Sequence, residues 1–250
     1  MIVHLFRRLV FIDATPEPAC GVGVKLPVSA NRKSPALAAH RLALGACQRC
    51  ELGPGIRPIV SRASNPRAML VGQAPGQVEA EGGVPFSGRA GKTLFRWLAR
   101  AGLDEATARD IIYISAVTRC YPGPHPSGRG DRVPNRHEQS SCADWLETEL
   151  RIIKPSVLIP VGRLAIERFL PDIPLSELIG TSRTVQHIGG KSVVIPLPHP
   201  SGASSWIHQV GNKALLEKAI DLLGIALDPS QPPGSARLRL QSHDRQPQER

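Results

Sequence analysis

The stretch that decides the fold is Ala68-Met-Leu-Val-Gly-Gln-Ala-Pro-Gly76, where four apolar residues run directly into a turn-forming sequence. A short apolar run bounded by Gly and Pro is typical of a buried strand in a parallel or mixed sheet. Residues 90–102 follow with apolar side chains at helical spacing, so we expect a strand, a loop and a helix in succession. This order favours an α/β fold.

The same alternation continues on both sides of this stretch. We expect further strands at 111–117 and 156–160 and a hairpin of 184–188 with 192–197, and further helices at 34–44, 135–153, 164–170 and 212–226. The sequence therefore predicts a three-layer α/β sandwich with a central, mainly parallel four-stranded sheet flanked by helices. Ligands of such sheets bind beyond the carboxyl ends of the strands. Polar turns follow two of these ends, at Gly72–Gly76 and Pro198–Ser201, and form the expected site.

Length and composition define the domain. The chain has 250 residues, of which 41% are hydrophobic, enough to bury a core in one domain that we place at 34–227. We expect 1–33 to be a poorly ordered extension, and 228–250, rich in Pro, Gln, Ser and Arg, to be a disordered tail. No apolar run has the length of a membrane span, and residues 1–12 lack a secretory-signal pattern. We expect a cytoplasmic monomer with no membrane contact.

The positive charge of the chain is concentrated in one segment. The formal net charge is +10, and residues 119–136 carry four arginines against one aspartate. A basic excess focused on one loop suggests a polyanionic partner, most simply nucleic acid. A solvated basic surface explains the same charge, so both interpretations stay open at this point.

Four of the five cysteines form a possible metal site. Cys47 and Cys50 make a C-x-x-C pair, and Cys120 and Cys142 lie far downstream, whereas Cys20 falls in the extension and is expected to be a bystander. Two close thiols and two distant ones can hold zinc or an iron–sulfur cluster, and the spacing does not choose between them. The alternative is a chance C-x-x-C with two core thiols.

Two motifs identify a family. The segment 72–91 resembles the first motif of the family 4 uracil-DNA glycosylases, G-E-x-P-G, then a Glu, then G-x-P-F-x-G-x-A-G. Pro198-His-Pro-Ser201 resembles the second, histidine-containing motif, and the resemblance covers roughly residues 36–226. It implies a base-excision repair enzyme that flips uracil out of DNA and hydrolyses its N-glycosidic bond. It also implies a structural 4Fe–4S cluster on Cys47, Cys50, Cys120 and Cys142, with uracil-containing DNA as the partner.

The resemblance and the reaction together suggest roles for the site residues. Uracil leaves with negative charge, so a donor must face the oxygen that gains this charge. His199 is expected to be that donor and Phe86 to stack on the flipped base. Backbone amides of the Gly72–Gln73 turn are expected to meet a uracil carbonyl, and Ser201 to bind phosphate.

The chain departs from the family motif at Gln73, where the family usually has Glu. This change removes an obvious water-positioning carboxylate, although Gln can still orient water. The later Glu of the motif is kept as Glu79, so we take His199, Gln73 and Glu79 as catalytic candidates. Ala116 stands where the family often has an Asn that reads the uracil edge.

These departures leave several functions open. The leading hypothesis is a monofunctional uracil-DNA glycosylase, since neither motif places a Lys as a Schiff-base nucleophile. The alternatives are a catalytically weak or inactive iron–sulfur protein that binds DNA lesions, a glycosylase for another deaminated base, and a zinc-dependent nucleic-acid module.

Overall fold

The computed structural model describes residues 34–53, 55–128, 130–201, 205–228 and 240. The expected extension at 1–33, with Cys20, lies outside the described residues, and so does nearly all of the expected tail at 228–250. No helix among the described residues has both the length and the apolar composition needed to cross a membrane.

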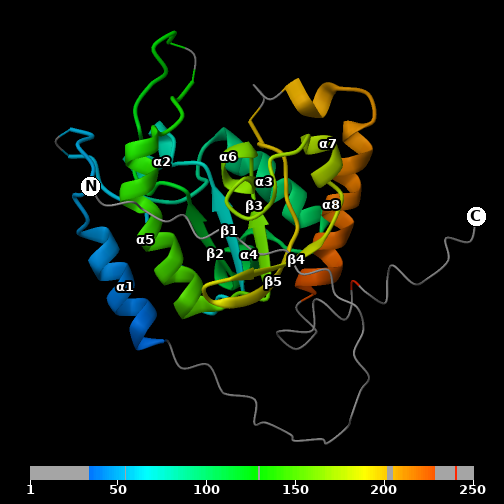
Figure 1. Ribbon diagram of the computed structural model, residues 1–250, viewed down its shortest axis with the longest axis horizontal. Helices are drawn as coiled ribbons and strands as arrows, with labels where there is room; N and C mark the ends of the chain where they lie inside the picture. Colours follow the sequence, from blue (N-terminus) through cyan, green and yellow to red (C-terminus); the bar gives the residue numbers. More distant parts are fainter. Residues whose placement is uncertain (1–33, 54, 129, 202–204, 229–239, 241–250) are drawn as a thin grey trace, which may run out of the picture.

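A five-stranded sheet forms the centre of the domain, in the order β2-β1-β3-β5-β4 (Figure 1). Strands β2, β1, β3 and β5 run parallel, and β4 pairs antiparallel with β5. The α/β prediction is confirmed, but the sheet has five strands rather than four, because both arms of the hairpin join it. The strands are β1 (Ala68–Gly72), β2 (Ile112–Ala116), β3 (Val157–Pro160), β4 (Arg183–His187) and β5 (Gly190–Val194).

Helices cover both faces of this sheet, as Figure 1 shows. Helix α1 (Pro35–Gly45) packs beside α5 (Arg136–Ile153) on one face, and α3 (Arg89–Arg100) packs with α4 (Glu105–Ile111) and α8 (Asn212–Leu227) on the other. The shorter elements are α2 (Gln77–Gly82), α6 (Arg163–Ile166), α7 (Leu175–Leu178) and the 3-10 turn η1 (Ser205–His208).

Local capping explains where the long helices begin. The Ser34 side chain accepts from the Leu37 amide at the start of α1, and the Asn135 side chain accepts from the Glu138 amide at the start of α5. Such caps satisfy amides that have no partner inside the helix. Helix α6 ends well before the expected residue 170, because the amides of Arg168 and Phe169 bond at i−3 spacing ahead of Pro171.

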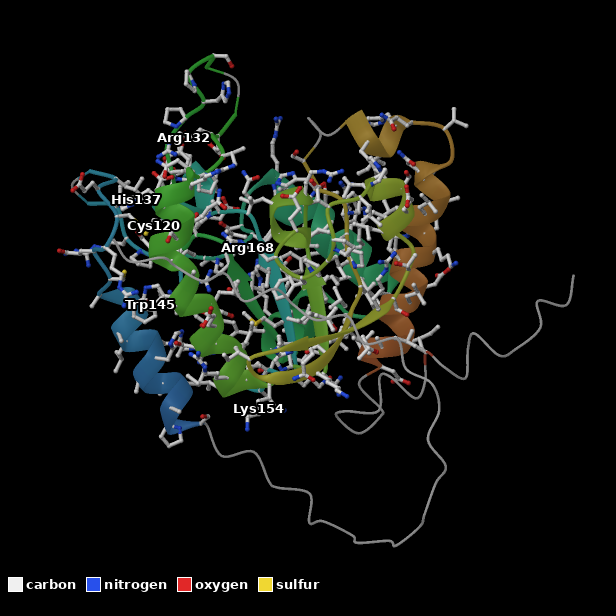
Figure 2. The ribbon with its side chains drawn as sticks, viewed as in Figure 1. Cys120, Arg132, His137, Trp145, Lys154 and Arg168 are labelled. Carbon is white, nitrogen blue, oxygen red and sulfur yellow. The ribbon has the colours of Figure 1, made fainter. Side chains whose placement is uncertain are left out.

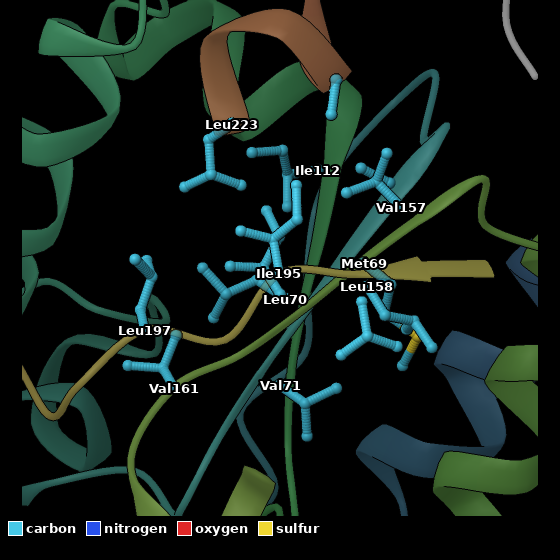
Figure 3. Close-up of a cluster of buried hydrophobic side chains, with 14 of the residues drawn as sticks. Met69, Leu70, Val71, Ile112, Val157, Leu158, Val161, Ile195, Leu197 and Leu223 are labelled. Atoms are coloured by element: carbon cyan, nitrogen blue, oxygen red, sulfur yellow. The ribbon is translucent and has the colours of Figure 1, made fainter. Parts of the chain in front are cut away.

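The core holds the strand ends together. Met69, Leu70 and Val71 of β1 are fully buried, and Figure 3 shows them among side chains of the neighbouring strands and Leu223 of α8. From β1 the chain continues to β2 on one side of β1. It then returns to β3 on the other side of β1 and continues outward to β5 and β4. A crevice at the carboxyl ends of β1 and β3 is the usual result of such divergence.

Candidate functional site

A cavity of about 420 Å³ lies at the carboxyl ends of the parallel strands. Its wall consists of the loop after β1, residues that follow β2 and β3, and residues beyond β5. All the site residues predicted from the two motifs line it, namely Gly72, Gln73, Glu79, Phe86, His199 and Ser201. The volume lies in the range of small-molecule sites, which suits one nucleobase.

Phe86 is held in an unusual backbone conformation beside Gly72. Its φ of 51° is in the left-handed region, which bulky residues rarely adopt. A Cβ on Gly72 would lie 3.1 Å from the Phe86 ring, and a Cβ on Gly91 would lie 1.8 Å from the Phe86 carbonyl oxygen. Arg109 donates to the carbonyls of Pro85 (2.9 Å) and Phe86 (3.3 Å). The two glycines and Arg109 therefore fix the position of the ring.

His199 has a defined proton arrangement. The Ser201 backbone N–H donates to its Nδ1 (3.2 Å), and the Ser201 hydroxyl lies 2.8 Å from the same nitrogen. Because a backbone amide can only donate, Nδ1 is an acceptor and the neutral ring carries its proton on Nε2. Burial lowers the pKa of His199. A Cβ on Gly162 would lie 3.1 Å from the imidazole, so this position, with φ of 83°, leaves room for the ring.

Glu79 and Gln73 occupy different settings on the cavity wall. The buried Glu79 carboxylate accepts from the amides of Gly76 (3.1 Å) and Gly88 (3.0 Å), so each of its oxygens has a backbone partner. Gln73 is half-buried, and its backbone carbonyl accepts from the Thr118 backbone amide (3.2 Å). This bond ties the β1 loop to the segment after β2.

Asp131 is a cavity residue that the motifs did not reveal. It reaches the wall from the loop after β2, where its Oδ2 lies 2.9 Å from the position of a Cβ on Gly76. Burial and then a hydrogen bond with Asp131 raise the pKa of Tyr121. The available signal was that Asp131 is the single acidic residue among the arginines of 119–136.

A second cavity of about 510 Å³ brings together Cys47, Cys50, Cys120 and Cys142. Figure 2 shows Cys120 beside α5, the helix that carries Cys142. Burial, followed by the neighbouring Cys142, raises the pKa of Cys50 to about 11 and that of Cys120 to about 12. No group of three or more His, Cys, Asp or Glu side chains in the described part of the chain is arranged to hold a single metal ion.

A buried charged network separates the two cavities. Arg119 lines both of them, and its Nη2 donates to the fully buried Glu149 (2.5 Å). Glu149 also accepts from Tyr113 (3.0 Å) and Ser115 (2.7 Å). Burial raises the pKa of Glu149, but the Arg119 charge and the hydrogen bonds from His40 and Ser115 outweigh this effect, so the pKa is lowered. The Glu149 carboxylate is thus ionised.

Pairing neutralises much of the basic segment 119–136. Arg119 is paired with Glu149, and Arg132 makes a two-bond contact with Glu138, at 2.8 and 2.5 Å. Arg129 lies outside the described residues, and Arg136 is exposed at the start of α5. The charge that the sequence concentrates in this loop is therefore only partly available to a partner.

Comparisons with known proteins agree with this geometry. The family model of the uracil DNA glycosylase superfamily matches residues 59–224. A type-4 uracil-DNA glycosylase of Thermotoga maritima is 33% identical over 135 residues, which cover 54% of this chain and 65% of that protein. The type-4 enzyme of Archaeoglobus fulgidus is 33% identical over 162 residues, or 62% of this chain and 76% of that protein.

A type-5 uracil-DNA glycosylase of Pyrobaculum aerophilum is also similar, with 32% identity over 115 residues, which cover 40% of this chain and 46% of that protein. The alignments with the type-4 enzymes extend over a larger part of this chain. With its two motif loops on one cavity and its superfamily match over more than half its length, this chain belongs to the uracil DNA glycosylase superfamily, in the type-4 branch.

Proposed function

We propose that the protein hydrolyses the N-glycosidic bond of uracil in DNA after flipping the nucleotide into the 420 Å³ cavity. The observation that carries this proposal is the convergence of Gln73, Phe86 and His199 on one cavity from two distant motif loops. The type-4 relatives are named for the same activity.

The proposed leaving-group donor is His199. Uracil departs as an anion, so a fixed N–H that meets its oxygen is most valuable in the transition state. The Ser201 amide already occupies Nδ1, which keeps the proton on Nε2 and fixes the ring. Phe86, held beside Gly72, would provide the stacking surface for the base.

Water must be positioned without the family carboxylate at position 73. We assign the orientation of water to the Gln73 amide and assign to Asp131 the carboxylate that accepts its proton, because both line the cavity. Glu79 is better placed as a positioning residue, since both of its oxygens accept backbone amides. In this arrangement the general base, Asp131, comes from the loop after β2 and not from the first motif.

The four cysteines would hold a 4Fe–4S cluster. They come from the end of α1, the segment after β2 and α5, and they share one cavity in which the thiols raise one another's pKa. Four thiolates can hold either zinc or an iron–sulfur cluster, and the choice of a 4Fe–4S cluster rests on the resemblance to the family 4 enzymes. Its contribution would be to cross-link these segments. Since the thiolate ligands must stay reduced, we also propose a cytoplasmic location. We propose separately that the protein is a monomer.

Metal analysis tests the cluster. Protein purified without oxygen should contain about four iron and four sulfide per chain, and a Cys142→Ser variant should lose most of the iron. Stoichiometric zinc without iron would contradict the cluster and favour the zinc-dependent module.

A single-turnover assay tests the activity. Oligonucleotides that carry uracil, hypoxanthine or thymine at one position are incubated with excess protein, and abasic-site formation is measured. We expect cleavage at uracil and none at thymine. Cleavage at hypoxanthine alone would assign the cavity to another deaminated base, consistent with Ala116 in place of the family Asn. Tight binding without any cleavage would favour the lesion-binding alternative.

A further inference from the structure

Helix α3 presents an unbroken basic face to solvent. Its sequence from Arg89 to Arg100 contains four basic residues and no acidic one. The basic residues are spaced by three or four positions, so they lie on one side of the helix, and all are exposed. The opposite side is buried against the core through Leu94, Trp97 and Leu98, among others. The basic face is Arg89, Lys92, Arg96 and Arg100.

Most of this charge is free of acidic partners. Arg100 pairs with Glu217. Arg96 donates to the neutral hydroxyl of Thr93 (3.1 Å), and none of the ion pairs within the described residues includes Arg89, Lys92 or Arg96. The contrast is with the segment 119–136, where two of the described arginines are paired.

The basic face begins at the cavity of about 420 Å³ proposed to hold the flipped base, which we call the nucleobase cavity. Arg89 lines that cavity and also a shallow surface groove, which continues along α3 past Lys92 and Arg96. The rise from Arg89 to Arg96 is about 10 Å at 1.5 Å per residue, which lets these side chains reach neighbouring phosphates of one strand. A strand that delivers a nucleotide to the cavity can therefore place successive phosphates along this face.

The opposite wall of the groove restricts where an anion can lie. Asp104 and Glu105 form that wall. Asp104 caps α4 through the Thr107 amide (2.8 Å), and Glu105 pairs with Arg109 (2.8 Å). The Glu105 charge is neutralised by Arg109, whereas none of the ion pairs within the described residues includes Asp104. Asp104 therefore repels phosphate from this wall and favours a nucleic-acid backbone on the α3 side.

We propose that Arg89, Lys92 and Arg96 form a phosphate-binding track for the DNA strand next to the nucleotide in the cavity. The proposal rests on the proposed function for the identity of the nucleic acid. The track contacts the backbone alone, so it contributes affinity and register but no sequence preference.

Salt-dependent DNA binding tests the track. The variant Lys92→Gln/Arg96→Gln removes two charges and leaves Arg89, which also lines the cavity, in place. Binding to a duplex with a stable abasic analogue, which the protein cannot cleave, is measured by fluorescence anisotropy over a range of salt concentrations. We expect weaker binding and a slope of log K against log salt reduced by roughly 1.8, at about 0.9 for each lost phosphate contact.

The matched control is Lys154→Gln/Lys191→Gln, which removes the same charge far from the cavity. Lys154 lies at the end of α5 (Figure 2), and Lys191 lies near the start of β5, at the end of that strand away from the cavity. Its slope should match the wild type, and circular dichroism should show both variants folded.

An unchanged slope in the α3 variant, or an equal loss in the control, would overturn the track. The wild-type cleavage assay decides the proposed function separately, because the abasic duplex reports binding alone. A track variant that loses slope while the wild type fails to cleave uracil would support the track and reject the glycosylase.

Discussion

The two cavities on either side of Arg119 are built in different ways. The nucleobase cavity is formed largely by loop backbone and by side chains from two motif loops, whereas the cysteine cavity joins thiols from segments far apart in the chain. The first is suited to chemistry and the second to holding elements together. Changes in the nucleobase cavity should therefore affect rate more than stability, and changes in the cysteine cavity should do the reverse.

Arg119→Met would break this separation most strongly, because Arg119 lines both cavities. It leaves Glu149 as a fully buried carboxylate without its guanidinium. Loss of one partner of such a pair costs about 3–5 kcal/mol of unfolding free energy. The urea midpoint of unfolding, the iron content and the cleavage rate should all decrease together.

The control for this variant is the double substitution Arg119→Met/Glu149→Gln. Gln keeps an acceptor for Tyr113 and Ser115 but carries no charge. It should recover more than half of the lost stability. A double variant as unstable as Arg119→Met would show that packing, and not charge, is the cause.

His199→Ala should slow single-turnover cleavage by roughly 100- to 1000-fold, about 2.7–4 kcal/mol, which is the usual effect of losing one such donor. The urea midpoint and iron content should stay near wild type, because His199 contacts only the nucleobase cavity. Equal cleavage by the variant and the wild type would remove His199 from the mechanism.

Phe86→Ala should weaken binding of uracil-containing DNA by about 1–3 kcal/mol, the contribution of stacking on one base. Anisotropy titrations with uracil-containing and undamaged duplexes measure this loss, which should be confined to the former. Phe86→Leu is the matched control, since it keeps apolar volume but not the aromatic face. If Leu binds as well as Phe, the residue fills space and does not stack.

Asp131→Asn should reduce the cleavage rate by roughly tenfold, about 1.4 kcal/mol. Gln73→Glu restores the family carboxylate and should recover the rate in the double variant. The single-turnover assay decides the assignment. No loss in Asp131→Asn would leave Gln73 alone to orient the water.

The smallest effect is expected from pH. Burial lowers the pKa of His199 below its usual value near 6.5, so the neutral donor persists from about pH 6.5 to pH 9 and the rate should be flat there. As the pH falls through the lowered pKa, protonation of Nδ1 displaces the Ser201 amide, so both the rate and the histidine contribution to stability decrease. A rate that rises on acidification would identify the imidazolium as the active form.

The sequence predicts what local patterns and motifs determine. The strand at 68–72, the starts of the helices near 34 and 135, and the grouping of Phe86 and His199 on one cavity all follow from apolar runs, helical periodicity and loops at strand ends. The hairpin was also expected, but strand count depends on whether both arms pair with the sheet, which is a tertiary property.

The sequence does not predict which charges meet in space. The partner of Arg119 lies thirty positions away on α5, and no local pattern links the two residues. The basic segment 119–136 is prominent by density, yet Arg132 is paired. The charges of α3 are less dense but fall on one face because of helical periodicity. Asp131 is likewise not predictable from local pattern, because its place on the cavity wall depends on the contact of its loop with Gly76.

The single carboxylate of Glu79 closes the loop from Gly76 to Gly88 on itself. If either end opens, a buried carboxylate oxygen loses its amide partner, so the two ends should open and close together as one unit. The amides of Gly76 and Gly88 should exchange with solvent at similar, slow rates. The entropy of ordering this loop is then lost during folding and not during the encounter with DNA, so a flipped nucleotide meets a cavity wall that is already in place.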